Sequence, residues 1–221
     1  NPPLVSSYTS DASETYRTDA VVLMIEVSDV EDSDEEVTVT IEHMAPQGSW
    51  SSSYISSLWF NSSSQRWQAN FTPPISATLG DYDVRVMVTD ADDGTSAWST
   101  FSDNITVLNN APVFQNYATS ADEVLRTSTI VIGVNSTDTE DSETAHTVTI
   151  QYRAPSGTWI ASDLSTPWYN SAAGRWESNY TPVAGSELGV YDLRINVTDT
   201  DGDDTGWNTF NDIVEVTNNV P

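Results

Sequence analysis

Two stretches of the sequence decide the fold, and the second is nearly a copy of the first. Residues 79–92 read LGDYDVRVMVTDAD, and residues 188–201 read LGVYDLRINVTDTD. From the tyrosine to the valine six residues later, an apolar side chain occupies every second position in each stretch, and Asp and Arg fill the first two positions between. An alternation of period two predicts a β-strand with one buried face and one face toward water.

The whole chain consists of two copies of one repeat. A shift of 109 positions aligns residues 1–112 with residues 110–221 without a gap. All eight tryptophans form pairs at this spacing: Trp50/Trp159, Trp59/Trp168, Trp67/Trp176 and Trp98/Trp207. Self-similarity over the full length predicts two domains, residues 1–109 and 110–221. The Asn- and Pro-containing segment at the start recurs at the joint and at the end, which favours a piece of a longer array over a complete two-domain protein.

Alternating apolar residues recur elsewhere in each copy. In the first copy they run through residues 21–27 and 37–41, and further strands are predicted at residues 4–8, 66–71 and 101–108. Gly, Pro, Asn, Asp and Ser separate these segments, and no helical periodicity competes with them. About seven short strands in a domain of this length are typical of an antiparallel two-sheet sandwich. The sequence therefore predicts an all-β fold with two sandwiches in tandem.

Composition excludes several classes of function. The chain has 33 acidic residues, seven arginines and no lysine, so its formal net charge is −26. Such a surface repels nucleic-acid phosphates and anionic membranes, so we expect no nucleic-acid partner. Without cysteine there is no disulfide and no thiolate metal site, and without lysine there is no Schiff-base or isopeptide chemistry. No apolar run is long enough to cross a bilayer, so we expect no direct membrane insertion.

The sequence also predicts that the protein is not an enzyme and has no catalytic residues. The two histidines are not equivalent, because the 109-residue shift pairs His43 with Tyr152 and His146 with Val37. A catalytic triad or a histidine-ligated metal needs a base placed in a concave site. The carboxylates instead cluster in loops that both copies share, which is typical of metal binding or of a solvated surface.

Three features of the sequence resemble a known group of domains. They are the two strand segments quoted above, the acidic segments at residues 27–32 and 136–141, and the Asn-Asn-x-Pro joint. Together they resemble immunoglobulin-like repeats of the PKD and cadherin-like kind, which occur in bacterial and archaeal cell-surface proteins. The resemblance covers both copies and implies two tandem immunoglobulin-like antiparallel β-sandwiches of about seven strands each. It also implies that Tyr82 and Tyr191 form tyrosine corners, with each hydroxyl bonded to nearby backbone.

Acidic loops provide a candidate metal site in each copy. In an immunoglobulin-like sandwich the loop after the second long strand and the loop before the last strand lie at the same end, where the chain enters. Carboxylates crowded there repel one another unless a hard cation joins them, and oxygen-only ligands favour calcium. We expect calcium to rigidify the joint between the repeats; the alternative is a set of solvated acidic turns. The candidate ligands are Asp29, Glu31, Asp32, Asp90, Asp92, Asn109, Asn110, Asp138, Glu140, Asp141, Asp199 and Asp201.

Asparagines in N-x-Ser/Thr sequons are a second candidate feature, because this triplet is the acceptor for N-glycosylation. The sequence predicts that at least one of them carries a glycan; the alternative is ordinary polar surface. Four of them lie at outward-facing positions of predicted strands. The six sequon asparagines are Asn61, Asn70, Asn104, Asn135, Asn179 and Asn196.

Aromatic and basic side chains allow two interpretations. Trp50, Trp59 and Trp67 are predicted to fill the core or pin loops, although exposed indoles would instead provide a platform for sugars. Arg85 and Arg194 lie at outward positions beside Asp83 and Asp192. We expect them to form exposed ion pairs, each worth about 0.2–1 kcal/mol.

These observations favour a non-catalytic structural repeat module of an extracellular surface or filament-forming protein. Its predicted partners are neighbouring copies of itself or further repeats of a longer chain, and glycans are a further possible partner. The absence of cysteine and lysine and the large acidic excess fit an exposed, hydrated setting, extracellular or at the cell surface. The alternative is an adhesin, or a carbohydrate-binding accessory module of a secreted protein.

Overall fold

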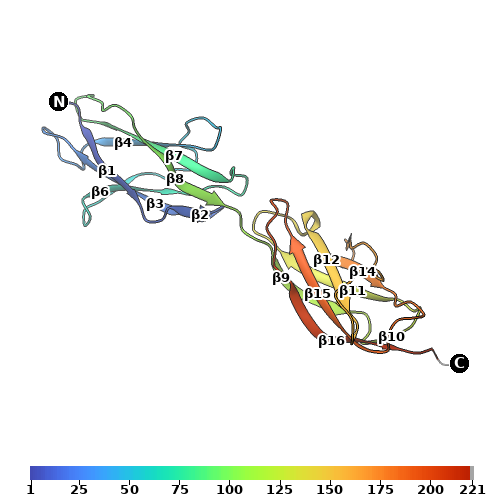
Figure 1. The fold of residues 1–221 in the computed structure, drawn as a ribbon. Helices are drawn as coiled ribbons and strands as arrows, with labels where there is room; N and C mark the ends of the chain where they lie inside the picture. Colours follow the sequence, from blue (N-terminus) through green and yellow to red (C-terminus); the bar gives the residue numbers. More distant parts are fainter. Residues whose placement is uncertain (220–221) are drawn as a thin grey trace. The chain divides into compact units, whose positions relative to one another are not determined.

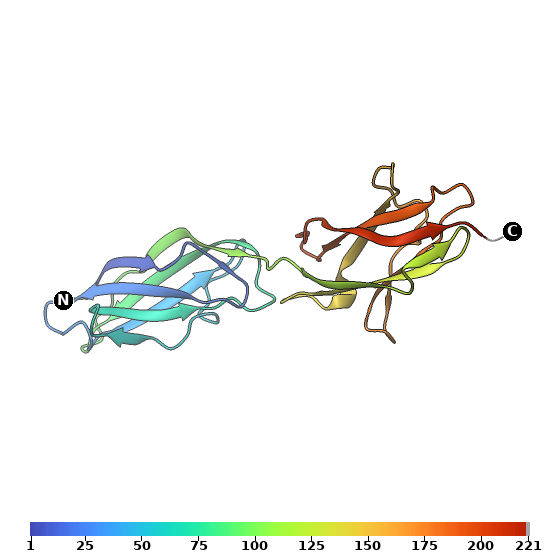
Figure 2. The ribbon, with the colours of Figure 1, turned by 90° about the horizontal axis from the view of Figure 1, so that it is seen from below.

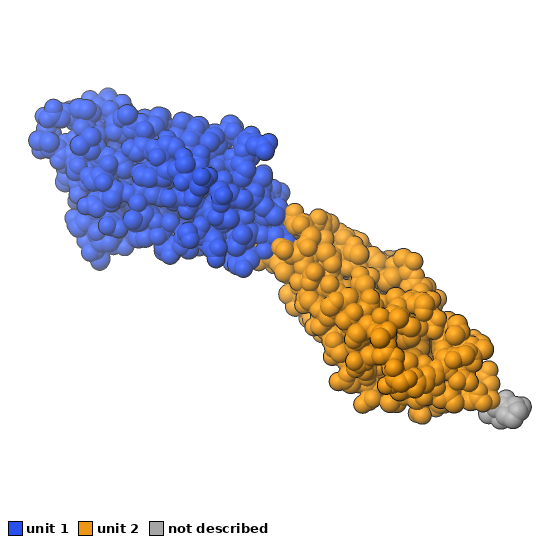
Figure 3. Space-filling model, in the orientation of Figure 1, with its two compact units in different colours: residues 1–109 blue, residues 110–221 orange. Residues whose placement is uncertain are grey.

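The protein divides into two compact units, Asn1–Asn109 and Asn110–Pro221 (Figures 1 and 3). In this computed structural model, residues 1–219 are described. Each unit is built almost entirely of β-strands, so the predicted all-β fold is confirmed. Among the described residues the only helical element is the short 3₁₀ helix Glu143–Ala145. None of them forms a helix with the length and apolar character needed to cross a membrane.

The first unit contains eight strands in two four-stranded sheets. One sheet has the order β1-β3-β6-β5 and the other β2-β8-β7-β4. Neighbouring strands are antiparallel except β2 and β8, which are parallel. The strands are β1 (Leu4–Ser10), β2 (Glu14–Tyr16), β3 (Val21–Ser28), β4 (Thr38–Met44), β5 (Trp59–Asn61), β6 (Arg66–Phe71), β7 (Gly80–Thr89) and β8 (Ser99–Leu108).

The second unit repeats this arrangement, with sheet orders β13-β14-β11-β9 and β10-β16-β15-β12. The pairing registers also correspond: Val21 lies opposite Phe71, and their copies Ile130 and Tyr180 lie opposite each other. In Figure 2 the two sheets of this unit form separate facing layers. The strands are β9 (Val113–Thr119), β10 (Glu123–Leu125), β11 (Ile130–Thr137), β12 (Thr147–Arg153), β13 (Trp168–Asn170), β14 (Arg175–Tyr180), β15 (Gly189–Thr198) and β16 (Asn208–Thr217).

Each unit has its own core between its two sheets. The alternating apolar residues of β3, β4 and β7 are buried as their period predicts, and Leu23, Ile25 and Val86 are fully buried. In the second unit the equivalent positions, among them Ile132 and Ile195, form a separate core. Burial of the same alternate positions in both copies explains why one repeat sequence builds two similar sandwiches.

A tyrosine ties a loop to the core in each unit. The Tyr82 hydroxyl donates to the carbonyl of Thr78 at 2.9 Å, and the Tyr191 hydroxyl donates to the carbonyl of Glu187 at 2.8 Å. Both rings are buried, so each hydroxyl satisfies a backbone carbonyl four residues earlier. This is the arrangement expected of a tyrosine corner.

A bulge shapes the last strand in the same place in both units. The register between β7 and β8 shifts after Tyr82, and that between β15 and β16 shifts after Tyr191. On the opposing strands Asp103 and Asp212 have positive φ values of 48° and 56°, which aspartate tolerates better than most residues. Their backbone N–H groups donate to the Asp83 and Asp192 carboxylates. Asp83 and Asp192, which precede Arg85 and Arg194 by two residues, therefore accept hydrogen bonds from the backbone of the bulge.

Candidate functional site

Two acidic loops of the second unit are joined by hydrogen bonds. The loop after β11 folds around Asp138, whose Oδ1 accepts the N–H groups of Glu140 at 2.7 Å and Asp141 at 2.8 Å. Asp141 Oδ2 then accepts both the N–H and the hydroxyl of Thr200, in the loop between β15 and β16. Asp199 is buried in that second loop and accepts two of its backbone N–H groups. The two loops thus lie together, as the sandwich topology predicts.

Carboxylate oxygens without hydrogen-bond donors lie inside this loop pair. Asp138 Oδ2 and Glu140 Oε2 are buried and have no hydrogen-bond partner. Glu140 Oε1 accepts from the side-chain amide of Asn110 at 2.7 Å and from its backbone N–H at 3.2 Å. Burial raises the pKa of Glu140, the bonds from Asn110 oppose that rise, and the nearby charge of Asp138 adds to it.

The first unit repeats this arrangement with its own residues. Asp29 Oδ1 accepts the N–H groups of Glu31 and Asp32, and these bonds hold the pKa of Asp29 below its usual value. Asp32 Oδ2 accepts the N–H of Ala91 at 3.1 Å, so the two loops of this unit are also joined. Asp29 Oδ2 is buried without a hydrogen-bond partner, as is the equivalent Asp138 oxygen. Both copies therefore keep a buried carboxylate oxygen at the same place.

The predicted ligands do not all come together. Asp92 and Asp201 are exposed at the tips of their loops, and the Asn109 side-chain oxygen accepts from Arg17 Nη1 at 3.3 Å. Within the described part of the chain, no three Asp, Glu, His or Cys side chains converge as a preformed metal centre. The pair Asp138 and Glu140, with Asn110 beside it, is the closest approach to such a site.

The sequon asparagines lie on strands and strand ends. Asn70, Asn135, Asn179 and Asn196 alternate with buried residues on β6, β11, β14 and β15, and all four are half-buried. Two more, at β5 and β8, are also half-buried: Asn61 accepts two backbone N–H groups of the following turn, and Asn104 has a buried oxygen without a hydrogen-bond donor. The four strand asparagines therefore point outward as expected, although they are half-buried and not fully exposed.

Arginine and tryptophan side chains form a stack on the outer face of each unit. The Arg85 guanidinium lies 4.5 Å from the ring centre of Trp50 and 4.1 Å from that of Trp98. It also forms an ion pair with Glu42, and only about a quarter of each of the two charged side chains is exposed. Arg85 is therefore not the exposed arginine beside Asp83 that the sequence predicts, because two indoles cover it and its partner lies on the neighbouring strand β4.

The second stack differs in its acceptor. Arg194 lies 4.8 Å from the ring centre of Trp159 and 4.1 Å from that of Trp207, but its Nε donates to neutral Gln151. A second arginine, Arg153, also lies 4.8 Å from the ring centre of Trp159. Its Nε donates to Asp192, and this bond lowers the pKa of the Asp192 carboxyl. Sequence reasoning missed these stacks, although the paired recurrence of Trp and Arg at the 109-residue spacing is a signal for them.

The remaining tryptophans fall into two groups, one partly buried and one exposed. Trp67 and Trp176 are partly buried against the two cores, and each indole N–H donates to a backbone carbonyl at 2.8 Å. Trp59 and Trp168 lie on the short edge strands β5 and β13, with 39% and 38% of their surface exposed. The sequence predicts that Trp59 fills the core or pins a loop, but the ring lies on an exposed edge strand instead. Trp207, in the stack of the second unit, is similarly exposed at 41%.

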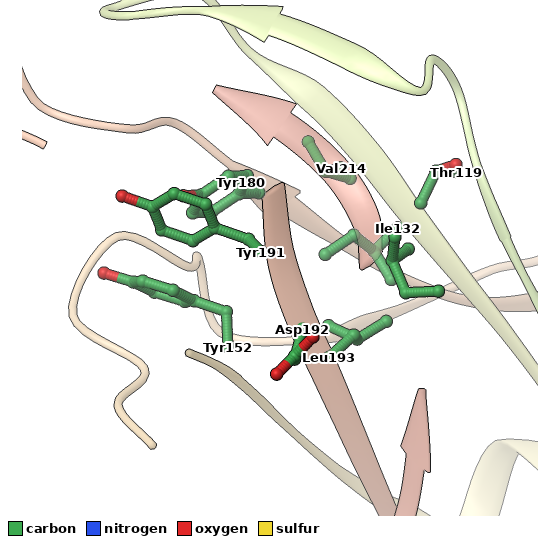
Figure 4. A pocket seen from close by; sticks show the side chains of 9 residues that line it. Thr119, Ile132, Tyr152, Tyr180, Tyr191, Asp192, Leu193 and Val214 are labelled. Carbon is green, nitrogen blue, oxygen red and sulfur yellow. The ribbon is translucent and has the colours of Figure 1, made fainter. Parts of the chain in front are cut away.

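A cavity of about 10 Å³ lies inside the second unit, where Tyr152, Tyr180 and Tyr191 stand side by side (Figure 4). This volume holds at most one water molecule. Larger hollows of about 270 to 490 Å³ are shallow surface depressions beside loops, and none of them is lined by a histidine. None of these hollows is an enclosed site in which a base and a nucleophile meet.

The chain has distant structural neighbours among known proteins. No protein-family model matches the sequence, and a search of curated proteins finds no significant match. Among solved structures, the titin domains Z1Z2 in complex with telethonin share 14% identity, with 100% of this chain and 98% of that chain covered and a TM-score of 0.47. A marsupial T cell receptor shares 8% identity over 98% of this chain and 73% of its own, with a TM-score of 0.37.

The fibronectin(III)-like modules of Clostridium thermocellum CbhA share 12% identity, with 95% of this chain and 93% of that chain covered and a TM-score of 0.31. At such low identity these similarities concern the fold alone. The sheet orders and the two tyrosine corners, rather than these similarities, define the chain as two β-sandwich domains in tandem.

Proposed function

We propose that the chain is a non-catalytic structural repeat module of an extracellular surface or filament-forming protein, stiffened by calcium and N-glycosylated. One observation carries this function: two sandwiches, each with its own core, repeat the same loops, bulges and arginine–tryptophan stacks. A repeat that preserves its packing in every copy is suited to building an array. Its partners are neighbouring copies or further repeats.

Calcium binds the acidic loops of each repeat under this proposal. The support is the pair of buried oxygens Asp138 Oδ2 and Glu140 Oε2, together with Asp29 Oδ2 in the first repeat. A buried carboxylate oxygen without a donor is costly, and a divalent cation offsets that cost. The available donors are all oxygens, which matches the preference of calcium. Asn110 stands beside Glu140 and donates two hydrogen bonds to it.

Calcium should therefore stabilise the protein against unfolding. At a free concentration ten times its dissociation constant, a cation that binds only the folded state adds about 1.4 kcal/mol. We expect the melting temperature to rise with calcium and to fall again on chelation, as followed by circular dichroism. Isothermal titration calorimetry should detect the binding directly, with magnesium as the comparison ion.

Substitutions distinguish a bound ion from general screening of charge. Asp138→Asn together with Asp199→Asn should abolish the calcium response of the second repeat. The matched control is Asp122→Asn, which removes an exposed charge outside these loops. Equal melting in calcium and in chelator for the unmodified protein would show that the loops are solvated turns. A response that survives in the double variant would place the ion elsewhere.

A binding function is the second candidate, and the exposed indoles favour it. Trp59 and Trp168 occupy equivalent positions on the edge strands of the two repeats, each with more than a third of its surface exposed. Aromatic faces of this kind stack on sugar rings. An adhesin or a carbohydrate-binding accessory module would use them, and substitution of both by alanine would then remove glycan binding.

A further inference from the structure

His43 lies in an aromatic cluster inside the first repeat. Its side chain projects from β4 into the core, and only 4% of the residue is exposed. The imidazole stacks on Tyr54, with ring centres 4.3 Å apart and an angle of 17° between the planes. The rings of Phe71 and Tyr82 complete the cluster at 5.5 and 5.8 Å.

Both nitrogens of His43 are constrained. Nε2 accepts the backbone N–H of Tyr54 at 3.3 Å, so it must be the unprotonated nitrogen of a neutral ring. Nδ1 then carries the proton, and it is buried without a hydrogen-bond partner. The His43 backbone also pairs with Ser51 through two hydrogen bonds of 2.8 and 2.9 Å. His43 therefore holds the segment Ser51–Tyr54 of the β4–β5 loop against its strand.

No acidic group is placed to stabilise a protonated ring. The titratable side chains packed against His43 are Tyr54 from the loop and Tyr82 from β7, and β6 contributes the uncharged Phe71. Glu42 precedes His43 on β4, but its carboxylate pairs with Arg85 on the opposite face. Burial lowers the pKa of His43 to about 4, and the charge of Glu42 opposes this shift only in part.

The second repeat lacks this device at the equivalent positions. There Tyr152, Asp163 and Tyr180 replace His43, Tyr54 and Phe71. Figure 4 shows Tyr152 and Tyr180. The loop still pairs with the strand through Tyr152 and Ile160, and the Tyr152 hydroxyl lies 3.3 Å from that of Ser162. Burial raises the pKa of Tyr152 to about 12, so this ring keeps its proton at neutral and mildly acidic pH.

We propose that His43 is an acid-sensitive latch: protonation of its ring releases the β4–β5 loop of the first repeat, while the matching loop of the second repeat stays closed. A proton on Nε2 would turn the acceptor for Tyr54 into a donor that faces another donor. The resulting imidazolium would have two N–H groups in an aromatic cluster without an acceptor for either. Opening the loop exposes the ring to water, which separates the two facing donors and gives both N–H groups an acceptor.

The sign of the effect follows from the lowered pKa. The open state binds a proton near the ordinary histidine value of about 6.5, whereas the closed state binds it only near 4. The latch is therefore fully closed above pH 6.5 and weakens as the pH falls from 6.5 toward 4. Between pH 7 and pH 5 the opening constant should rise about 20-fold.

Hydrogen exchange of the full chain measures this opening. We expect the peptide covering residues 50–55 to lose protection about 20-fold between pH 7 and pH 5, after correction for the intrinsic pH dependence of exchange. The peptide covering residues 159–164 should keep its protection. That second peptide is an internal control, because both repeats share the same acidic background and the loop of the second repeat packs on Tyr152 where the first has His43. Equal responses of the two peptides would overturn the latch.

Two variants complete the test. His43→Gln removes the proton site and keeps an acceptor for Tyr54, so its loop should show no acid response. The triple variant His43→Tyr, Tyr54→Asp and Phe71→Tyr transplants the cluster of the second repeat and should behave in the same way, which guards against a packing defect in the single variant. A 20-fold loss of protection that persists in either folded variant would assign the response to another group.

Discussion

Replacement of Phe71 by alanine should cost the first repeat about 3–5 kcal/mol of unfolding free energy. Phe71 is fully buried on β6 and packs against His43 and Tyr82 at the centre of the first core. Its removal leaves a cavity that rigid strands on both sides cannot fill. Because the second core is made only of residues from its own repeat, its unfolding free energy should stay unchanged.

Calorimetry or circular dichroism of the full chain checks this expectation. The first-repeat transition should move to lower temperature while the second-repeat transition stays in place. The matched control is Asn70→Ala, one residue earlier on β6 and directed outward, which should change the stability far less. A single cooperative transition that shifts as a whole in the Phe71 variant would contradict two independently folded repeats.

Arg85→Ala should destabilise the first repeat by about 2–3 kcal/mol, well above the value for an exposed ion pair. The substitution removes two contacts with indole faces and leaves Glu42 three-quarters covered without its cation. Arg85→Lys keeps the charge but loses the flat guanidinium that fits between the two rings, so it should recover only part of the loss. Urea unfolding of both variants measures these differences.

The second repeat provides the comparison for this stack. Arg194 has the same two indole contacts, but its acceptor is the neutral Gln151. Arg194→Ala should therefore cost less than Arg85→Ala, because no buried carboxylate loses its partner. Equal losses would mean that the ion pair with Glu42 adds nothing, and losses below 1 kcal/mol in both would mean that the stacks do not stabilise the fold.

Most of the fold follows from the alternation of side chains. The period of two along residues 82–88 and 191–197 determines which side chains face the core, and the 109-residue shift transfers that pattern to the second copy. The four three-residue strands, β2, β5, β10 and β13, were not predicted, because three residues are too few to show a period. With two of them in each repeat, the structure has eight strands per repeat where about seven were expected.

The candidate site was predictable only in outline. Sandwich topology brings the acidic loops together, as the bonds from Asp32 to Ala91 and from Asp141 to Thr200 show. The sequence does not reveal that these carboxylates bond to their own turns, since such bonds depend on loop geometry. The Arg85 stack and the His43 latch were missed for a related reason: each depends on side chains from separate strands and loops whose meeting the local pattern does not encode.

Electron microscopy of the intact protein that carries these repeats tests the structural function most directly. We expect a repeating polymer or an ordered surface layer in calcium, with the tandem sandwiches as its regular unit. Dispersed single particles that bind immobilised glycans, and lose that binding when Trp59 and Trp168 are replaced by alanine, would contradict a structural module and establish a binding module in its place.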